Sequence, residues 1–253
     1  MKRIDKNALR YGMTTVLALV IAALLPAQNM SIDEIIDRLD ENLVQDTSYA
    51  EITMTVKDRF GERTSTMEAY SKGRDLSLIE FTSAAERGQK VLRTEDEIYL
   101  FYPDAAELVR LQGAALRESM LGSDISYEDM TGNKTLRETY DAELLGTERV
   151  NGRDCYKVRL EAKRANVAYP VQVMWVDTED FSLQKSEQYS LNGRLLKTIE
   201  VNETELINGR YIATDMTISD ALKRNSSTRM VMEDIELGLR LSDDLFSLEE
   251  LTW

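Results

Sequence analysis

The stretch AELLGTERVNGRDCYKVRLEAK, residues 142–163, decides the fold class. Tyr156, Val158 and Leu160 alternate with charged residues, which is the period of two of a strand with one buried face. Asn151-Gly152 stands at its centre, and Asn-Gly is the strongest short hairpin signal because both residues tolerate the positive φ of a type I′ turn. The stretch therefore predicts two antiparallel strands, 142–150 and 154–163, joined by a tight turn.

The same pattern of β-type runs separated by turn residues extends in both directions along the chain. Asn192-Gly193 and Asn208-Gly209 are two more Asn-Gly pairs between β-type runs. We therefore predict an antiparallel meander of about ten or eleven strands, in which strands that follow one another along the chain pair side by side. A twisted sheet of that size curls, and a helix can plug its concave face. The other expected strands are 50–56, 64–71, 76–82, 90–93, 98–102, 170–177, 183–191, 195–206, 211–219 and 228–237.

Three segments predict helices. Ser31 and Glu34 form a Ser-x-x-Glu capping box, and apolar residues then recur at helical spacing up to Leu43. The middle segment, 113–131, favours short helical turns, and 242–251 favours a short terminal helix. The first helix has one apolar stripe and should cover an apolar surface, because a short helix alone is marginal in water.

The N-terminus has the layout of a secretory signal peptide. Four basic residues, Lys2, Arg3, Lys6 and Arg10, precede an apolar run at 16–25. The run is shorter than the ~20 residues of a membrane span. We predict a cleavable signal peptide over residues 1–27, with an uncleaved N-terminal anchor as the alternative, a single domain over 28–253 and a periplasmic location.

Composition excludes several classes of function. The chain has a formal charge of −14, which opposes binding to nucleic acid. It has no histidine, so Ser-His-Asp triads and His-based zinc sites are excluded, and Cys155, the one cysteine, is expected in the core. Adjacent acidic pairs such as Asp243-Asp244 leave a carboxylate hydrolase open as a minor alternative. We expect no enzymatic activity, no cofactor and no metal.

Several strands are apolar on both faces, as a protein that shelters a hydrocarbon chain requires. One face can line a cavity while the other packs elsewhere, and flexible methionines suit adaptable apolar surfaces. The candidate cavity residues are Ile52, Met54, Val56, Ile79, Phe81, Leu100, Tyr102, Met120, Leu121, Val173, Trp175 and Met216.

The run MLGSDISYED, residues 120–129, resembles a signature of bacterial outer-membrane lipoprotein-sorting proteins of the LolA-like superfamily. Residues 32–43 are similar to that family's opening helix, 97–111 to its strand with a Tyr-Pro ending, and 244–253 to its C-terminus. The likeness covers nearly all of the chain after the signal. Its signature residues are Gly122, Ser123, Asp124, Ser126, Tyr127, Glu128 and Asp129.

This resemblance implies a fold, a cargo and partners. The fold would be a curved antiparallel half-barrel of the LolA/LolB type with helices as a lid. The cargo would be the acyl chains of lipoproteins or other lipids, received from an inner-membrane ABC or RND-type exporter and passed to an outer-membrane acceptor, with only transient membrane association. A basic residue would hold the lid shut; Gly73 stands at that position, with Lys72 and Arg74 beside it. The alternatives are a periplasmic sensor domain on the same fold or an accessory protein of an RND-type lipid exporter.

Overall fold

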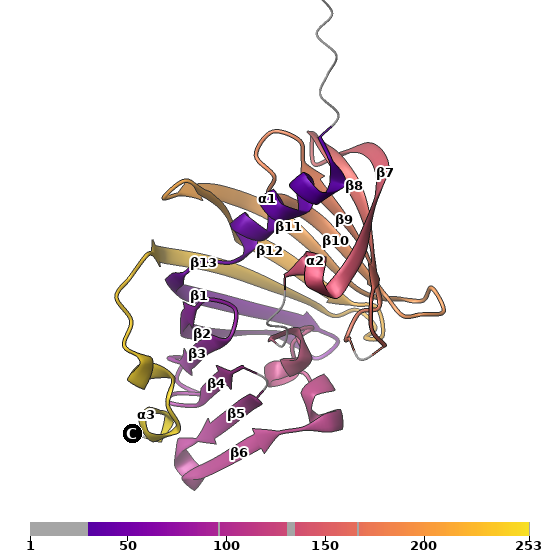
Figure 1. Ribbon diagram of the computed structural model, residues 1–253. Coiled ribbons are helices and arrows are strands. Elements are labelled where there is room, and N and C mark those ends of the chain that lie inside the picture. Colours follow the sequence, from indigo (N-terminus) through magenta and orange to yellow (C-terminus); the bar gives the residue numbers. More distant parts are fainter. Residues whose placement is uncertain (1–29, 96, 131–134, 166, 253) are drawn as a thin grey trace, which may run out of the picture.

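The computed structural model describes residues 30–95, 97–130, 135–165 and 167–252, so the predicted signal peptide lies outside the described residues. Within these ranges, thirteen strands form one antiparallel sheet (Figure 1). The strands are β1 (Thr47–Asp58), β2 (Gly61–Lys72), β3 (Leu76–Phe81), β4 (Lys90–Thr94), β5 (Glu97–Tyr102), β6 (Glu107–Leu111), β7 (Tyr140–Val150), β8 (Arg153–Ala162), β9 (Val171–Asp177), β10 (Leu183–Tyr189), β11 (Leu195–Ile207), β12 (Arg210–Asp220) and β13 (Ser227–Leu237).

Two meanders make up this sheet. The order runs from β6 back to β1 and then from β13 back to β7, so the first and last strands pair in the middle of the sheet. β6 and β7 are the two edges. The chain between them, residues 112–139, carries the short turns η2 (Gly113–Arg117), η3 (Met120–Gly122) and η4 (Tyr127–Met130) and the helix α2 (Leu136–Thr139). We call residues 112–130 the crossover segment. The predicted curved, antiparallel half-barrel is confirmed.

The sheet has thirteen strands rather than about ten or eleven. The twelve ranges expected from the sequence correspond to twelve of them, and β6 is the additional strand. Pro103 opens a 3₁₀ turn, η1 (Pro103–Ala105), which looks like the end of a strand. Ala106 then adopts a left-handed conformation (φ 49°) and lets the chain re-enter the sheet as β6. The expected terminal helix is likewise split into η5 (Asp243–Phe246) and α3 (Leu248–Leu251).

Two of the three Asn-Gly pairs form the predicted tight turns. Asn151-Gly152 and Asn208-Gly209 have positive φ at both residues. At Asn192-Gly193 only the glycine does, and the turn is wider: the amide of Gly193 donates to the Ser190 carbonyl, and the amide of Ser190 donates to the Arg194 carbonyl.

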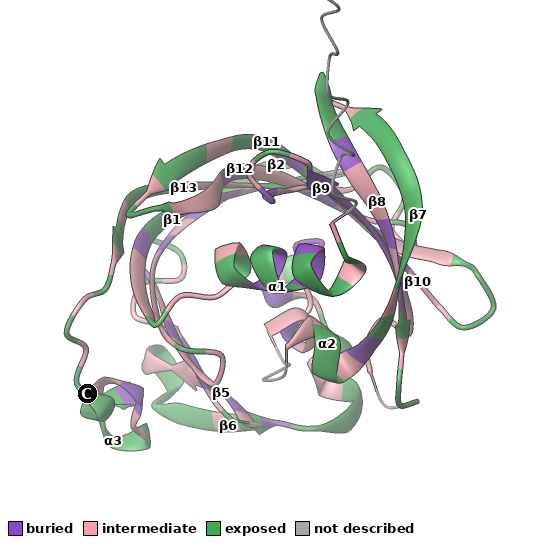
Figure 2. Cartoon of the chain, turned by 45° about the horizontal axis from the view of Figure 1, so that its top comes forward, coloured by how far each residue is buried: buried purple, intermediate pink, exposed green. Residues whose placement is uncertain are grey.

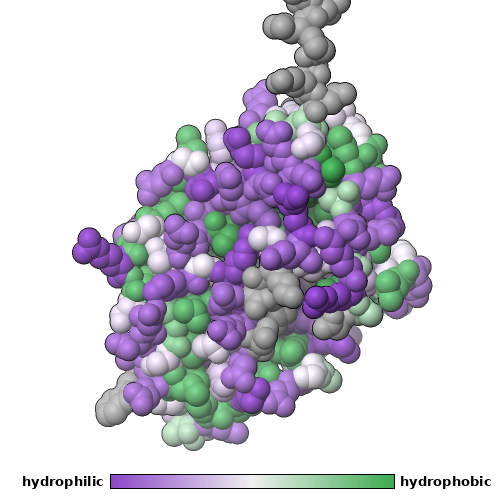
Figure 3. All heavy atoms as spheres, viewed as in Figure 1, coloured by the Kyte–Doolittle hydropathy of each residue, from purple (hydrophilic) through white to green (hydrophobic). Residues whose placement is uncertain are grey.

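The first helix, α1 (Ile32–Leu43), lies inside the curved sheet (Figure 2). Ser31 caps it through its hydroxyl, which accepts a hydrogen bond from the Glu34 amide at 3.2 Å. Ile35, Ile36 and Leu39 are fully buried against the concave face of β7 to β9. The opposite side of the helix is exposed to solvent. Hydrophilic residues cover most of this face of the molecule (Figure 3). The helix therefore plugs one half of the barrel.

The two faces of the sheet have separate cores. On the concave side, strands β1 to β6 pack against the crossover segment. On the convex side, the C-terminal turns cover Leu78 and Leu92 with Phe246 and Leu251. Cys155 is fully buried on the convex side of β8, where burial raises the pKa of its thiol to about 11. None of the helices in the described ranges has the length and hydropathy needed to span a bilayer.

Candidate functional site

A cavity of about 830 Å³ lies between the middle of the concave face, the helices α1 and α2, and the crossover segment. A second hollow of about 470 Å³ shares Glu128, Val167 and Ala168 with it and extends toward the β10–β11 turn at Leu191. The second hollow therefore adjoins the cavity on the side of the β10–β11 turn.

The wall of the cavity is of mixed polarity. The apolar part is formed mainly by side chains on β11 to β13, with contributions from the helices and the crossover segment. The polar part combines carboxylates, cations and amides. The apolar residues are Leu43, Ile125, Leu136, Val167, Ala168, Ile199, Met216, Ile218 and Met230; the charged and amide residues are Asp40, Arg74, Glu128, Asp129, Glu138, Arg164, Gln172, Gln188 and Lys197.

The structure brings most of the predicted cavity residues together, but not at this cavity. Nine of the twelve lie in the apolar cluster of β1 to β6, which the crossover segment fills with its own side chains. Among the described residues that line the cavity, Met216 represents the predicted set. The nine are Ile52, Met54, Val56, Ile79, Phe81, Leu100, Tyr102, Met120 and Leu121.

Val173 and Trp175 lie on the other side of the sheet. They pack with Cys155, and the ammonium groups of Lys157 and Lys185 lie 4.9 and 4.8 Å from the centroid of the Trp175 ring. The alternate residues of β9, from Gln172 to Val176, face the concave side. Because β9 is apolar on both faces, its alternation could not reveal which face would be concave.

The signature attaches the crossover segment to β12 and β13. Asp124 is buried, and its carboxylate accepts hydrogen bonds from Thr228 Oγ1 (2.8 Å), Ser226 Oγ (2.9 Å) and the Asp220 amide (3.2 Å). Lys223 reaches the same segment from the β12–β13 turn and donates to Ser119 Oγ at 2.6 Å. These contacts hold the segment across the opening of the half-barrel.

The backbone conformation of Gly122 explains the glycine of the signature. Gly122 adopts φ +71°, in the left-handed region that favours glycine, and Nη2 of Arg63 donates to its carbonyl oxygen. Leu121 beside it is also left-handed, with φ 49°. The chain turns sharply here so that the Met120 side chain is buried beneath the segment.

The end of the signature lies at the cavity itself. Asp129 accepts hydrogen bonds from the hydroxyl of Tyr169 and from the ammonium group of Lys197 on β11. The backbone amide of Ser126 also donates a hydrogen bond to this carboxylate, at 2.6 Å. Burial is the main reason why the pKa of Tyr169 is raised, and the negative charge of Asp129 raises it further. The phenol therefore stays protonated. The other signature residues, Tyr127 and Glu128, lie respectively in the apolar cluster and on the cavity wall.

Of the two basic residues considered as a lid latch, Arg74 contacts α1. Its guanidinium lies 3.3 Å from Oδ1 of Asp40, whose Oδ2 accepts a hydrogen bond from the Leu136 amide of α2 at 3.0 Å. Lys72 instead pairs with Asp243 of the C-terminal segment at 2.5 Å. Gly73 takes the left-handed conformation (φ +60°) of the β2–β3 turn, and the basic residue stands one position later.

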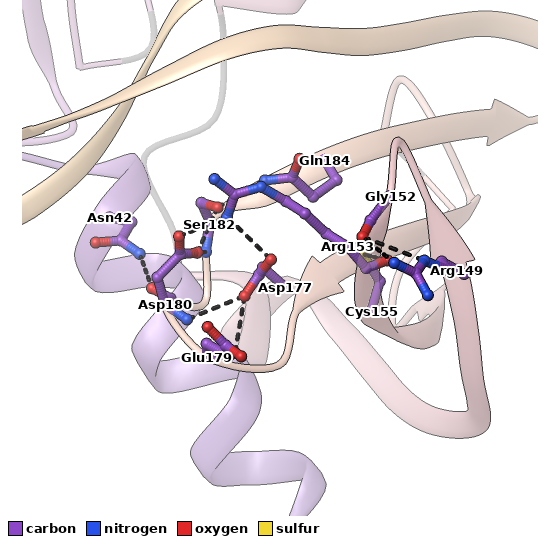
Figure 4. Close-up of polar contacts among 10 residues, drawn as sticks. All are labelled: Asn42, Arg149, Gly152, Arg153, Cys155, Asp177, Glu179, Asp180, Ser182 and Gln184. Atoms are coloured by element: carbon purple, nitrogen blue, oxygen red, sulfur yellow. Dashed lines mark hydrogen bonds and ion pairs between the residues drawn. The ribbon is translucent and has the colours of Figure 1, made fainter.

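The same C-terminal turn of α1 also contacts the β9–β10 turn and β12. Asn42 donates to the Asp180 carbonyl at 3.0 Å and accepts from the Tyr211 amide at 3.1 Å. In the close-up, Asn42 reaches from α1 to the β9–β10 turn, where Arg153 lies between Asp177 and Asp180 (Figure 4). The last turn of α1 is therefore attached through Asp40 to the β2–β3 turn, and through Asn42 to the β9–β10 turn and β12.

Burial raises the pKa of Asp40, and the Arg74 charge offsets this only in part. The carboxylate at the junction of α1, α2 and the β2–β3 turn is thus more readily protonated than an aspartate exposed to solvent. The amides on the cavity wall could not be recognised from the sequence, because polar residues at alternate strand positions normally face water. Asp40 could not be recognised either, because it is one of several acidic residues on α1.

The half-barrel, its plugging helix and the cavity between them define a LolA-like protein. A structure of a LolA superfamily protein from Nitrosomonas europaea matches with a TM-score of 0.73 and 26% identity, over 87% of this chain and 99% of that one. A family model described as "-like: Uncharacterized protein" matches residues 73–253, and the chain belongs to that family.

Two further structures share the fold. A DUF1329 family protein from Desulfovibrio piger matches with a TM-score of 0.79 and 27% identity, over 86% of this chain and 96% of that one. A domain from Vibrio parahaemolyticus, described as outer membrane lipoprotein-sorting, matches with a TM-score of 0.77 and 22% identity, over 88% and 97%. No curated protein matches the sequence.

Proposed function

We propose that this protein is a periplasmic carrier that binds the acyl chains of lipoproteins or other lipids in the 830 Å³ cavity and moves them between the inner and outer membranes. The single observation that carries the proposal is this cavity, because a site for a small hydrophobic ligand typically measures ~300–1,000 Å³. Its apolar wall of Ile199, Met216, Ile218 and Met230 gives hydrocarbon a dry surface. The LolA superfamily fold supports the same function.

The energetics suit a carrier. Each buried methylene contributes ~0.8 kcal/mol, so about ten of them supply ~8 kcal/mol, equivalent to a micromolar Kd. The apolar cluster beneath the crossover segment adjoins the cavity at Ile125, which lies in both. Movement of the crossover segment away from the sheet adds hydrocarbon-binding surface. Its return to the closed position expels the acyl chain toward an acceptor. Release thus follows from a difference in ligand affinity between the two arrangements.

The lid would be the α1–α2 pair, with Arg74 and Asp40 as its latch. Lys72 belongs to the C-terminal contact and has no part in this mechanism. Export through a signal peptide over residues 1–27 completes the proposal. It predicts that the protein made with its full N-terminus is recovered from the periplasm with an intact mass that corresponds to cleavage after Ala27.

Native mass spectrometry of detergent-free protein tests the carrier function. We expect co-purified lipid or acylated peptide that exchanges with added membranes. Met216→Trp narrows the apolar part of the cavity and should weaken this adduct, whereas Leu206→Trp, which adds the same side chain at an exposed position of β11, should keep it. A uniformly empty wild-type protein that binds only a protein partner contradicts the carrier and favours the sensor.

A further inference from the structure

A row of buried amide and amine side chains crosses the concave face where a hydrocarbon site should be apolar. Gln188 on β10 pairs in register with Gln172 on β9 and with Lys197 on β11. All three line the cavity, and none is more than 9% exposed. Since polar groups are costly to bury without partners, this row requires an explanation.

The charges around the row nearly cancel. Lys197 is neutralised by Asp129, and Arg74 by Asp40. The remaining charged residues of the described wall are Glu128, Glu138 and Arg164. Acidic groups therefore slightly outnumber basic ones, and such a wall does not favour an anionic ligand over a neutral one.

One polar atom of the row is left without a partner. The side-chain oxygen of Gln188 is buried and has no hydrogen-bond partner among the described residues, although the residue lies on the cavity wall. An unsatisfied buried acceptor is destabilising, and a ligand whose donor meets this oxygen when the Gln188 amide group turns toward the cavity removes that cost. The apolar wall begins at Ile199, two residues along β11 from Lys197, and continues on β12 at Ile218, the register partner of Ile199, and at Met216.

We propose that the cavity selects a neutral lipid that carries an amide N–H or a hydroxyl next to its acyl chain. The donor lies against Gln188, and the chain runs along Ile199, Met216, Ile218 and Met230. A free fatty acid and a lipid without a donor are both poorer ligands, the first because of its charge and the second because it leaves the amide oxygen unpaired. This inference rests on the proposed acyl-binding function and names its class of cargo.

Calorimetric titration of the wild-type protein with three C16 ligands tests the inference. The ligands are N-palmitoylethanolamine, which has both donors, methyl palmitate, which has none, and palmitate, which is anionic. We expect the first to bind about tenfold more tightly than either of the others, as one additional hydrogen bond in a buried site allows. Equal affinities, or a preference for palmitate, overturn this inference and leave the carrier function standing. Absence of binding by all three overturns both.

A matched pair of variants assigns the preference to one residue. Gln188→Leu should abolish the tenfold preference while binding of methyl palmitate is kept. Gln184→Leu changes a buried glutamine on the same strand that bonds to Ser182 and does not line the cavity, so it should keep the preference. A preference retained in Gln188→Leu overturns the assignment, and the wild-type ligand series stays decisive if either variant fails to fold.

Discussion

Thr228 and Asp124 exchange two hydrogen bonds. The Asp124 amide donates to Thr228 Oγ1, and that hydroxyl donates to the Asp124 carboxylate, each at 2.8 Å. Thr228 lies at the start of β13 and is fully buried, and Asp124 belongs to the crossover segment. This reciprocal contact attaches the connection between the two edge strands to the middle of the sheet.

Removal of this anchor should destabilise the fold. Asp124→Ala leaves Thr228, Ser226 and the Asp220 amide without their acceptor, and we expect a loss of ~3 kcal/mol in the free energy of unfolding. Urea denaturation followed by circular dichroism measures it. Asp104→Ala, at an exposed position of η1, is the control and should change stability by less than ~0.5 kcal/mol. A similar small change in Asp124→Ala contradicts the anchoring role.

Asp40 should make stability depend on pH in an unusual direction. Its pKa is raised above the ordinary 3.8 by burial, so the folded state binds a proton that the unfolded state releases. Its contribution to stability is therefore greatest below pH 3.8 and is lost as pH rises through the folded pKa. Asp40→Asn, which keeps an acceptor for the Leu136 amide, should be at least as stable as wild type at pH 7.

The stability difference between Asp40→Asn and wild type should vanish as the pH falls toward 3.8, and denaturant titrations across pH 4–7 measure it. Asp40→Ala removes the acceptor as well and should lose ~1–2 kcal/mol. An asparagine variant much less stable than wild type at pH 7 shows that the Arg74 ion pair outweighs the cost of burial, contrary to this prediction.

The ion pair between Lys197 and Asp129 should be strongly coupled. Lys197→Met alone leaves the Asp129 carboxylate with Tyr169 and Ser126 as its donors among the described residues, and we expect a cost of ~2 kcal/mol. The double variant Lys197→Met/Asp129→Asn should recover most of that loss. Thermal unfolding of the four members of the double-mutant cycle gives the coupling energy, and additive effects contradict a paired role.

Cys155 should be chemically silent in the folded protein. Its thiol is fully buried, and its pKa of about 11 leaves almost no thiolate at pH 8. Iodoacetamide should therefore label the native protein only at the rate of unfolding and label the denatured protein fully. Rapid labelling of folded protein, followed by intact mass, contradicts this burial.

Much of the fold could be predicted from local patterns. The cap at Ser31 and the apolar spacing up to Leu43 define α1, and the Asn151-Gly152 turn defines the β7–β8 hairpin. β6 escaped detection because its connection depends on a left-handed alanine at position 106, a conformation that composition does not reveal. Local sequence describes hairpins well because their partners are neighbours in the chain.

The candidate site was less predictable, because its determinants are distant in sequence. Asp124 and Asp129 could be singled out as a signature, but their partners Thr228 and Lys197 lie on strands far along the chain. Gln188 belongs to a strand, LQKSEQY, with polar residues on both faces. Only the pairing of β10 with β9 and β11 shows which of these residues face the cavity.

The pairing of β1 with β13 has a consequence for how the molecule is made. Met54 faces Met230 across this junction, so the centre of the sheet joins segments from the two ends of the described chain. Such contacts have high contact order and form late, because a long loop must be closed before they stabilise anything. Until β13 has been synthesised, β1 and β12 both expose a free edge. The nascent polypeptide therefore cannot complete its architecture early, and a chain in that state is open to translocation as well as to aggregation.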